Sequence, residues 1–325
     1  MNAPIFSLSP STQWAKVRLF GPDARDFLHR ITTARARGMN PGDGTWACIL
    51  TSQGKIRASF VLWCEAEDQF SMEIDPLNDG SHLRRLLEAI DQFTFAEKMT
   101  LESGPTPVGE QPYWIRFDSS TSLASAWKDW FPQNDQPSLT PSSRLTQVTP
   151  DGMIRVHCHG DSDFGGIWVS LWSKSPLAGA IELSPEKAAD WHQSRIQKLR
   201  PWPAQEISED VNPLEIGLPD SVAENKGCYP GQEVIEKIAA IGSPAKRLIQ
   251  VEGPLTSARP HVGEKLFQGG TEVGTLTSIH YTDENWTALA LGRKTVATPG
   301  VALQLSTGDS CEVRGVAPYL VEGIR

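Results

Sequence analysis

The sequence has 325 residues, more than one hydrophobic core usually serves, so two or three structural units are expected. Lys and Arg number 30 against 39 Asp and Glu, and the net charge of −9 offers nucleic acid no long-range basic field. No apolar run approaches the roughly 20 residues of a membrane span, and the first residues lack a secretory signal pattern. We therefore expect a cytoplasmic protein that binds neither nucleic acid nor a membrane directly.

The first hundred residues have the pattern of an α+β unit. Two segments carry apolar residues at the spacing of one helix face: 24–31 and 83–90. Four segments have the alternation or the short apolar run of strands: 15–19, 46–50, 56–63 and 70–74. Ser52-Gln53-Gly54-Lys55 would join two of them as a hairpin. This order of elements predicts antiparallel sheet covered by helices.

The middle of the chain continues the mixed pattern. Strands are predicted at 113–117, 153–157 and 167–172, and a helix at 123–130. A second helix should begin at Ser184, with Pro185 in its first turn, and end near Leu199. Residues 132–150 are polar and contain four prolines, so we predict a long loop there.

A change of pattern follows Gly242-Ser243-Pro244. Six short apolar segments separated by turns predict a small barrel or sandwich: 248–251, 265–267, 273–279, 287–291, 301–305 and 311–316. We place a domain boundary at this point. It divides the chain into an α+β body, residues 1–242, built of two intertwined subdomains, and a C-terminal β domain, residues 243–325.

The cysteines are widely spaced and include no CxxC pair, which argues against a zinc site, a four-cysteine cluster or a disulfide framework: Cys48, Cys64, Cys158, Cys228 and Cys311. Cys48 and Cys64 lie in apolar strands and are expected in the core. His157 and His159 would share one face of a strand, but further ligands are not supplied nearby. We predict no stable metal site.

One stretch concentrates chemical groups: Lys226-Gly227-Cys228-Tyr229-Pro230-Gly231-Gln232-Glu233. Tyr-Pro-Gly is typical of a turn, because Pro presets φ and Gly accepts positive φ. The apolar-rich residues 234–241 follow, so the turn should be anchored against a core. Cys228 is the main candidate, since a nearby cation such as Lys226 favours the reactive thiolate. The alternative is that Cys228 is simply a small buried apolar residue.

These eight residues resemble the K-G-C-[FY]-x-G-Q-E signature of YgfZ-type proteins, which are folate-binding relatives of the glycine cleavage T protein linked to iron–sulfur cluster assembly or repair. Other segments resemble the same family in the same order: 17–28, 50–56, 212–215, 263–266 and 273–276. The resemblance implies an α+β, three-lobed T-protein-like fold with antiparallel sheets and helices around a central cavity. A small C-terminal β-barrel would follow.

The sequence departs from its relatives at two places. In the T protein the strand after the hairpin carries an acidic residue central to aminomethyl transfer, whereas Ile56-Arg57-Ala58-Ser59-Phe60 has no carboxylate. An anion is needed to hold or deprotonate the reacting amine, so its absence disfavours that activity. The family usually has Arg shortly after the signature, where this chain has Lys237, which keeps the charge but loses the planar fork.

The resemblance implies a monomeric accessory protein that binds tetrahydrofolate or a one-carbon derivative and assists iron–sulfur cluster assembly or repair in client enzymes. Cys228 would be the reactive or transiently ligating thiol, shared with a client because one thiolate cannot hold a cluster. Tyr229, Gln232 and Glu215 would contact the pterin, and Lys226 and Arg247 the anionic groups. The remaining signature residues would shape the turn: Gly227, Pro230, Gly231 and Glu233.

Two other functions remain open at this point. One is a folate-dependent aminomethyltransferase of the glycine-cleavage T-protein type, which would need a carboxylate from another strand near the reactive nitrogens of the folate. The other is a non-catalytic scaffold, in which the signature turn is only structural.

Overall fold

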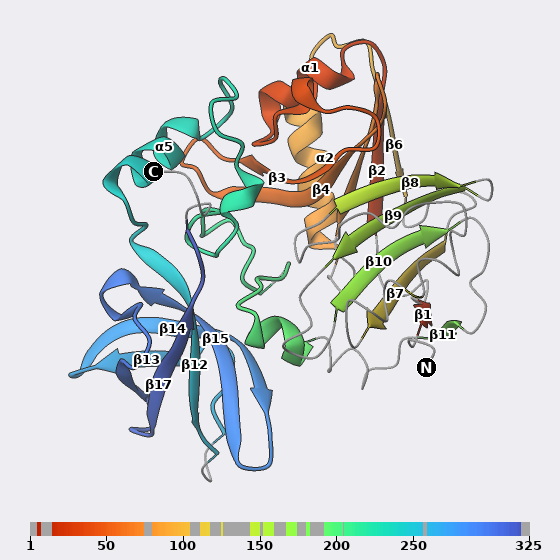
Figure 1. The fold of residues 1–325 in the computed structure, drawn as a ribbon. Coiled ribbons are helices and arrows are strands. Elements are labelled where there is room, and N and C mark those ends of the chain that lie inside the picture. Colours follow the sequence, from red (N-terminus) through yellow and green to blue (C-terminus); the bar gives the residue numbers. More distant parts are fainter. Residues whose placement is uncertain are drawn as a thin grey trace.

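The computed structural model describes residues 15–74, 80–104, 192–203, 205–255 and 259–319, residue 125, and the strand segments 5–7, 111–117, 144–149, 152–158, 167–173 and 180–182. In these residues the chain forms a five-stranded sheet, a six-stranded sheet and a closed barrel, which Figure 1 shows as three lobes. Nearly all strand pairs are antiparallel; β1 and β11 are the parallel pair. The predicted α+β class with a C-terminal barrel is confirmed.

The first lobe is the five-stranded sheet, with strand order β3-β4-β5-β2-β6. Its strands are β2 (Ala15–Phe20), β3 (Gly44–Leu50), β4 (Ile56–Ala66), β5 (Gln69–Ile74) and β6 (Thr100–Gly104). Its helices are α1 (Ala24–Ile31) and α2 (Ser81–Phe93), with a short 3-10 turn, η1 (Ala36–Gly38). The predicted apolar faces meet in one core, where Leu19, Phe27 and Leu86 are at most 1% exposed.

The second lobe is the six-stranded sheet, with strand order β11-β1-β7-β10-β9-β8. Its strands are β1 (Ile5–Ser7), β7 (Gln111–Phe117), β8 (Arg144–Thr149), β9 (Gly152–Cys158), β10 (Ile167–Ser173) and β11 (Ala180–Glu182).

The predicted loop over 132–150 is wrong at its end, because β8 pairs with β9 from Arg144 to Thr149. The prolines at 141 and 150 flank this strand without interrupting it, and its Thr and Val residues favour a strand. Of the predicted helix 123–130 the structure describes residue 125 alone, which is helical; the start of the helix from Ser184 lies outside the described residues, whereas 192–197 are helical.

The third lobe is the barrel, closed in the order β12-β15-β14-β13-β16-β17. Its strands are β12 (Lys246–Pro254), β13 (Lys265–Gln268), β14 (Thr271–Tyr281), β15 (Asn285–Arg293), β16 (Ala302–Leu305) and β17 (Ser310–Val316), with η3 (Lys294–Val296) after β15. All six predicted strands are confirmed. Buried side chains such as Val251, Trp286 and Val313 fill the interior, so the barrel is a packed core.

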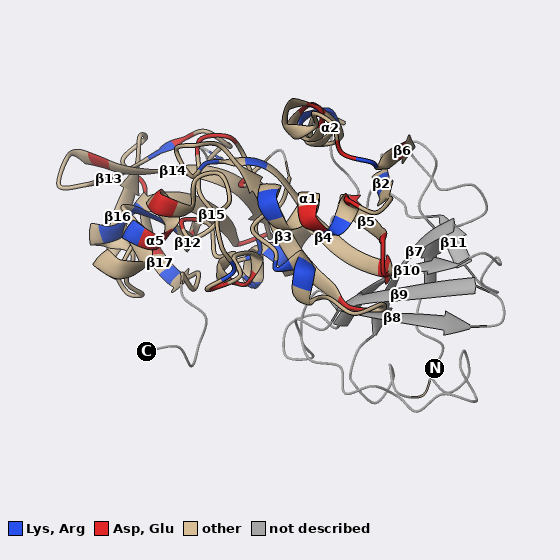
Figure 2. Cartoon of the chain, turned by 90° about the horizontal axis from the view of Figure 1, so that it is seen from above, with Lys and Arg blue, Asp and Glu red and all other residues tan. Residues whose placement is uncertain are grey.

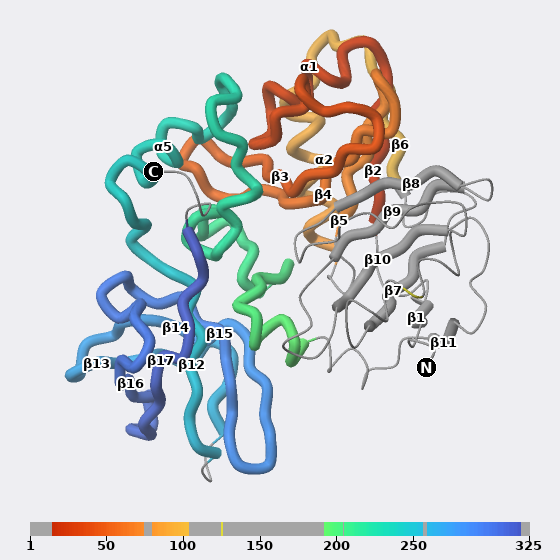
Figure 3. The backbone as a smooth tube through the Cα atoms, viewed as in Figure 1, coloured from red at the N-terminus to blue at the C-terminus, as the bar shows by residue number. Residues whose placement is uncertain are grey.

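Residues 205–222, hereafter the connecting segment, run between the first lobe and the barrel, as the tube in Figure 3 shows. The segment contains η2 (Pro219–Ser221), and α5 (Gln232–Ile241) follows it. Leu50 of β3, Leu214 and Ile216 of the segment, and Ile235 of α5 share one small core, against which Leu291 of the barrel packs. This core fixes the position of the signature residues.

A buried ion pair joins the helical residues 192–197 to the connecting segment, and its arginine also reaches the barrel. Arg195 donates to Glu206 at 2.9 Å, and both side chains are 1% exposed. Arg195 also donates to the Ser278 hydroxyl of β14 at 2.6 Å. Over the described ribbon, Figure 2 shows Lys and Arg interspersed with Asp and Glu. No helix in the described part of the chain is long and apolar enough to span a membrane.

Candidate functional site

The signature residues 226–233 form the approach to α5 and its first turn, at the junction of the first lobe and the connecting segment. Tyr229 packs against the small core that holds Leu50, Leu214 and Ile235. The predicted anchoring of this turn against a core is therefore observed. Only Ile235 of α5 is fully buried, however, and most of the helix faces solvent.

Lys226 joins the signature to α1. Its buried ammonium donates to the carbonyl oxygens of His29 at 2.5 Å and Thr32 at 2.6 Å, at the C-terminal end of that helix. It also lies 4.8 Å from the centre of the Tyr229 ring. Carbonyls at a helix C-terminus carry partial negative charge and favour a cation there. Burial lowers the pKa of Lys226 to about 8. These contacts make Lys226 an anchor, and its binding of an anionic ligand stays a prediction.

Gly231 brings the signature against the hairpin between β3 and β4. Its φ is +79°, and a Cβ atom there would lie 2.5 Å from the Thr51 carbonyl oxygen and 2.8 Å from Gly54 Cα. No other residue has both the required conformation and the required size. Gly227 also has positive φ, +100°, but a Cβ atom there would meet nothing closer than His29 at 3.9 Å. The glycine at 231 is therefore required by packing as well as by conformation.

Cys228 is exposed, whereas Cys48, Cys64 and Cys311 are buried. Burial raises the pKa of the Cys48 and Cys311 thiols to about 12 and raises that of Cys64 as well. The expected core positions of Cys48 and Cys64 are thus observed, and a buried apolar role for Cys228 is excluded. Among the described thiols, Cys228 is the one that a partner or reagent can reach.

Glu215 and Arg247 are held by internal contacts close to the signature. The Glu215 carboxylate accepts from the Asn212 backbone N–H at 3.0 Å and lies 3.3 Å from the Lys55 ammonium of the hairpin. Arg247 donates to the Ala317 carbonyl and lies 4.3 Å over the Tyr319 ring. Burial lowers the pKa of Arg247. Both side chains therefore support the junction of hairpin, connecting segment and barrel.

Tyr229 and Gln232 line a pocket of about 230 Å³ beside α5, hereafter the α5 pocket. Gln232 donates to Glu236 one helical turn later at 2.5 Å. Burial, with a smaller effect of Glu236, raises the pKa of Tyr229 to about 12, so the phenol stays neutral at physiological pH. Glu233 is exposed. Of the predicted pterin contacts, these two share a pocket, while Glu215 does not line it.

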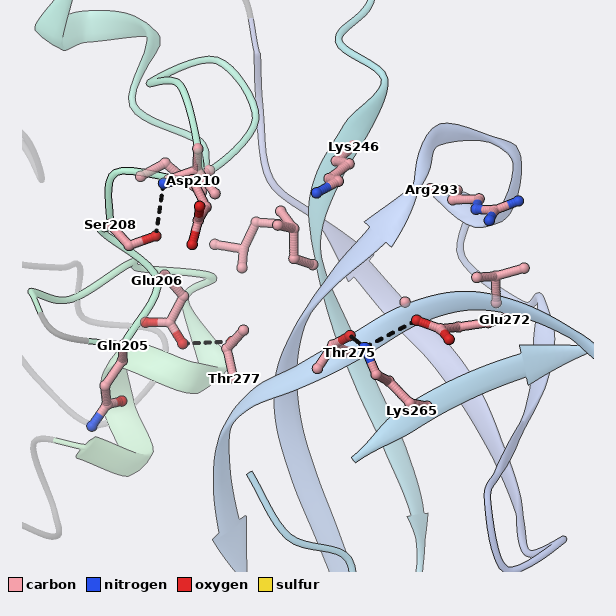
Figure 4. A pocket seen from close by; sticks show the side chains of 16 residues that line it. Gln205, Glu206, Ser208, Asp210, Lys246, Lys265, Glu272, Thr275, Thr277 and Arg293 are labelled. Carbon is pink, nitrogen blue, oxygen red and sulfur yellow. Dashed lines mark hydrogen bonds and ion pairs between the residues drawn. The ribbon is translucent and has the colours of Figure 1, made fainter. Parts of the chain in front are cut away.

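A larger cavity, of about 530 Å³, lies between the connecting segment and strands β12 to β15 of the barrel (Figure 4). We call it the segment–barrel cavity. Val211, Ile216, Leu248 and Leu291 supply apolar wall, and the other lining residues are mostly polar or charged. None of the predicted site residues lines it. It was missed because it depends on contacts between segments far apart in the sequence, none of which forms a local motif.

The charges of this cavity are only partly paired. Glu206 is satisfied by Arg195 and by the Thr277 hydroxyl at 2.7 Å, and Lys265 pairs with Glu272 at 3.0 Å. Lys246 and Arg293 stand directly opposite each other on β12 and β15, and neither forms an ion pair within the described residues. Like charges opposite each other on neighbouring strands repel, so an anion at this edge would be stabilising.

Metal binding finds no support in the described part of the chain, where no group of three or more His, Cys, Asp or Glu side chains could hold an ion. The side chains of His157 and His159 lie outside what the structure describes, so that alternative is untested.

The comparison with known proteins gives the family. Residues 7–104 match the GCVT N-terminal domain. The chain is 31% identical to the aminomethyltransferase of Geobacillus sp. (strain WCH70) over 266 residues, 79% of this chain and 70% of that protein. It therefore belongs to the glycine cleavage T family, which confirms the predicted relationship to the glycine cleavage T protein; the YgfZ-type assignment stays a prediction.

Two further relatives show how far the similarity extends. A putative chloroplastic transferase of Arabidopsis thaliana is 27% identical over 281 residues, 82% of this chain but only 60% of that longer protein. The crystal structure of glycine cleavage system aminomethyltransferase T from Bartonella henselae superposes with a TM-score of 0.71 at 15% identity, over 98% of this chain and 88% of that one. The T-protein-like fold thus covers nearly the whole chain.

Proposed function

We propose that this protein is a YgfZ-type member of the family, a cytoplasmic monomer that binds tetrahydrofolate or a one-carbon derivative and assists iron–sulfur cluster assembly or repair in client enzymes. One observation carries the proposal: the signature is fixed by Lys226 and Gly231 while its thiol, Cys228, remains exposed. A turn held this rigidly that presents a reachable thiol suits transfer chemistry better than a purely structural role.

The role of Cys228 in this proposal is transient. Its thiolate would bind an iron of the client's cluster, which is cargo here, while the client supplies the remaining ligands. A single thiolate cannot hold a cluster alone, so no stable cluster on the isolated chain is expected. Lys226 lies two residues away, and its ammonium is fixed by the carbonyls of His29 and Thr32, so it holds the turn that presents the thiol.

For the folate, the segment–barrel cavity offers the best fit among the described residues. Its volume of about 530 Å³ lies in the range of roughly 300–1,000 Å³ that is typical of small-molecule pockets. Gln205, Ser208 and Thr275 provide donors and acceptors for a pterin, and Lys246 and Arg293, which form no ion pair within the described residues, provide cations for carboxylates. Glu215 and Arg247 flank the lining residues Ile216 and Lys246 in sequence and would hold this wall in place.

Direct contacts of Tyr229 and Gln232 with the pterin stay predictions, since both line the separate α5 pocket. Tyr229→Phe and Gln232→Ala test them. A loss of tetrahydrofolate affinity in either variant, without a loss of thermal stability, would support the contact.

The aminomethyltransferase alternative is favoured by the names of the relatives and disfavoured by β4. Ala58, Ser59 and Phe60 are buried there, and Ile56 to Phe60 contains no carboxylate. Incubation with tetrahydrofolate and an aminomethyl donor distinguishes the two functions. Folate turnover would establish the transferase, whereas intact folate binding without turnover would favour the accessory role.

Cys228→Ala tests the proposed role of the thiol. In cells in which the only copy of this protein carries the substitution, we expect iron–sulfur client enzymes to lose activity. The melting curve of the purified variant should be unchanged. Because Cys228 is exposed, its loss should not create a cavity. Unchanged client activity would contradict the thiol role and leave the non-catalytic scaffold as the better explanation.

A further inference from the structure

The helix that follows the signature is unusually exposed for its composition. α5 reads QEVIEKIAAI, yet Ile235 is its one fully buried residue. At its C-terminal end Ala239, Ala240 and Ile241 are exposed, and Ile241 has 66% of its surface in solvent. Single exposed apolar residues are ordinary, but here three follow one another, and the first of them, Ala239, lines a pocket.

The α5 pocket has an apolar floor and an acidic rim. Leu214, Val222 and Ile235 line the floor, and Glu224 and Glu236 are its charged lining residues. No Lys, Arg or His lines it, and neither carboxylate forms an ion pair within the described part of the molecule. The cations near the pocket are held on backbone carbonyls: Lys226 and Arg247 beside the rings of Tyr229 and Tyr319, and Arg35 on the carbonyl oxygens of Glu224 and Asn225.

The volume and charge of this pocket select the kind of occupant. At about 230 Å³ it is smaller than the roughly 300 Å³ at which small-molecule pockets begin. It is large enough for one long side chain. An arginine would lay its apolar stem on Leu214 and Val222 and reach the two carboxylates with its guanidinium, which also stacks well on tyrosine. Arginine is also among the residues that most often anchor protein interfaces.

We propose that the α5 pocket and the exposed end of α5 form the docking surface for a partner polypeptide that presents an arginine next to apolar side chains. The arginine enters the pocket between Glu224 and Glu236, and the apolar side chains cover Ala240 and Ile241. Glu224 is only four residues from Cys228, so docking places the partner beside the exposed thiol. The link to cluster transfer rests on the proposed function, whereas the docking itself does not.

The test uses random peptides displayed on phage and selected against the immobilised full chain, followed by fluorescence anisotropy with the synthetic form of an enriched peptide. We expect enriched peptides to contain Arg beside Leu, Ile or Phe. Glu224→Gln with Glu236→Gln should weaken their binding about tenfold or more. The matched control is Asp283→Asn with Glu284→Gln on the barrel, which changes the net charge equally at another exposed site and should leave binding unchanged.

A second variant tests the pocket by shape. Ala239 is exposed and lines the pocket, so Ala239→Phe should fill its mouth and weaken peptide binding without a loss of thermal stability. Absence of enrichment, enriched peptides without basic residues, or equal effects of the two charge variants would overturn the proposal. Displacement of the peptide by tetrahydrofolate would also overturn it and would assign the pocket to the pterin. Folate binding is measured in a separate experiment without peptide, and it tests the proposed function independently of the docking.

Discussion

Gly231 and Gly242 stand at the two ends of α5 with nearly equal φ angles, +79° and +85°. Alanine at either position must adopt a left-handed conformation, which costs about 1–2 kcal/mol. At Gly242 a Cβ atom would meet nothing within 4 Å, so Gly242→Ala should cost little more than that. At Gly231 the Cβ atom would lie 2.5 Å from the Thr51 carbonyl and 2.8 Å from Gly54 Cα.

Relief of that overlap needs a shift of the backbone, because both contacts are with the main chain of the hairpin. Such overpacking costs a further 1–3 kcal/mol or so, which brings Gly231→Ala to roughly 2–5 kcal/mol. Urea unfolding of both variants, followed by tryptophan fluorescence, measures the difference. If Gly231→Ala loses no more stability than Gly242→Ala, the signature is not packed against the hairpin, and its turn is not fixed.

Three further predictions concern the exposure of the cysteines, the anchoring by Lys226 and the burial of His192. In the folded protein iodoacetamide should label Cys228 well before Cys48, Cys64 and Cys311, because these three are buried; peptide mass spectrometry after brief exposure measures this, and equal labelling would contradict the assignment. Lys226→Met should destabilise the protein by about 1–3 kcal/mol, because the His29 and Thr32 carbonyls lose a buried donor; an unchanged urea midpoint would show that Lys226 does not anchor the signature. Burial, helped by the Arg195 charge, lowers the pKa of His192 to about 4, so the unfolded chain takes up a proton near pH 6.5 and the folded chain only near pH 4. Stability should therefore fall as the pH drops through this window, and His192→Gln should reduce that fall by about 2 kcal/mol; an equal pH dependence in both proteins would refute it.

Local patterns were sufficient to predict most of the fold. Apolar patterns located four of the five strands of the first lobe but not β6, and they located all six strands of the barrel, where turn residues separate short strands. Local patterns failed at β8, because the polar, proline-rich stretch around it is typical of a loop, whereas its pairing with β9 decides its structure. The sequence also did not reveal how little of α5 is buried, since that depends on which surfaces reach the helix from elsewhere.

The sequence predicted the candidate site only where its residues form one local motif. The signature identified Cys228 as the residue to examine, and its exposure agrees with a reactive role. Lys226 contacts His29 of α1, which lies 197 residues earlier in the sequence, so no local pattern could predict this contact. The segment–barrel cavity was missed for the same reason: Gln205 and Lys246 come together only after the barrel has closed and the connecting segment has packed on it.

Isothermal titration of the full chain with tetrahydrofolate under anaerobic conditions measures whether the protein binds folate and with what stoichiometry. We predict binding of one folate per chain in the wild-type protein. We also predict a loss of about tenfold or more in Lys246→Glu with Arg293→Glu, but not in the matched control Arg84→Glu with Lys98→Glu, which reverses two exposed cations of the first lobe. Binding that is equal in both variants would move the folate out of the segment–barrel cavity. No detectable binding by the wild-type chain would contradict the proposed folate-binding function.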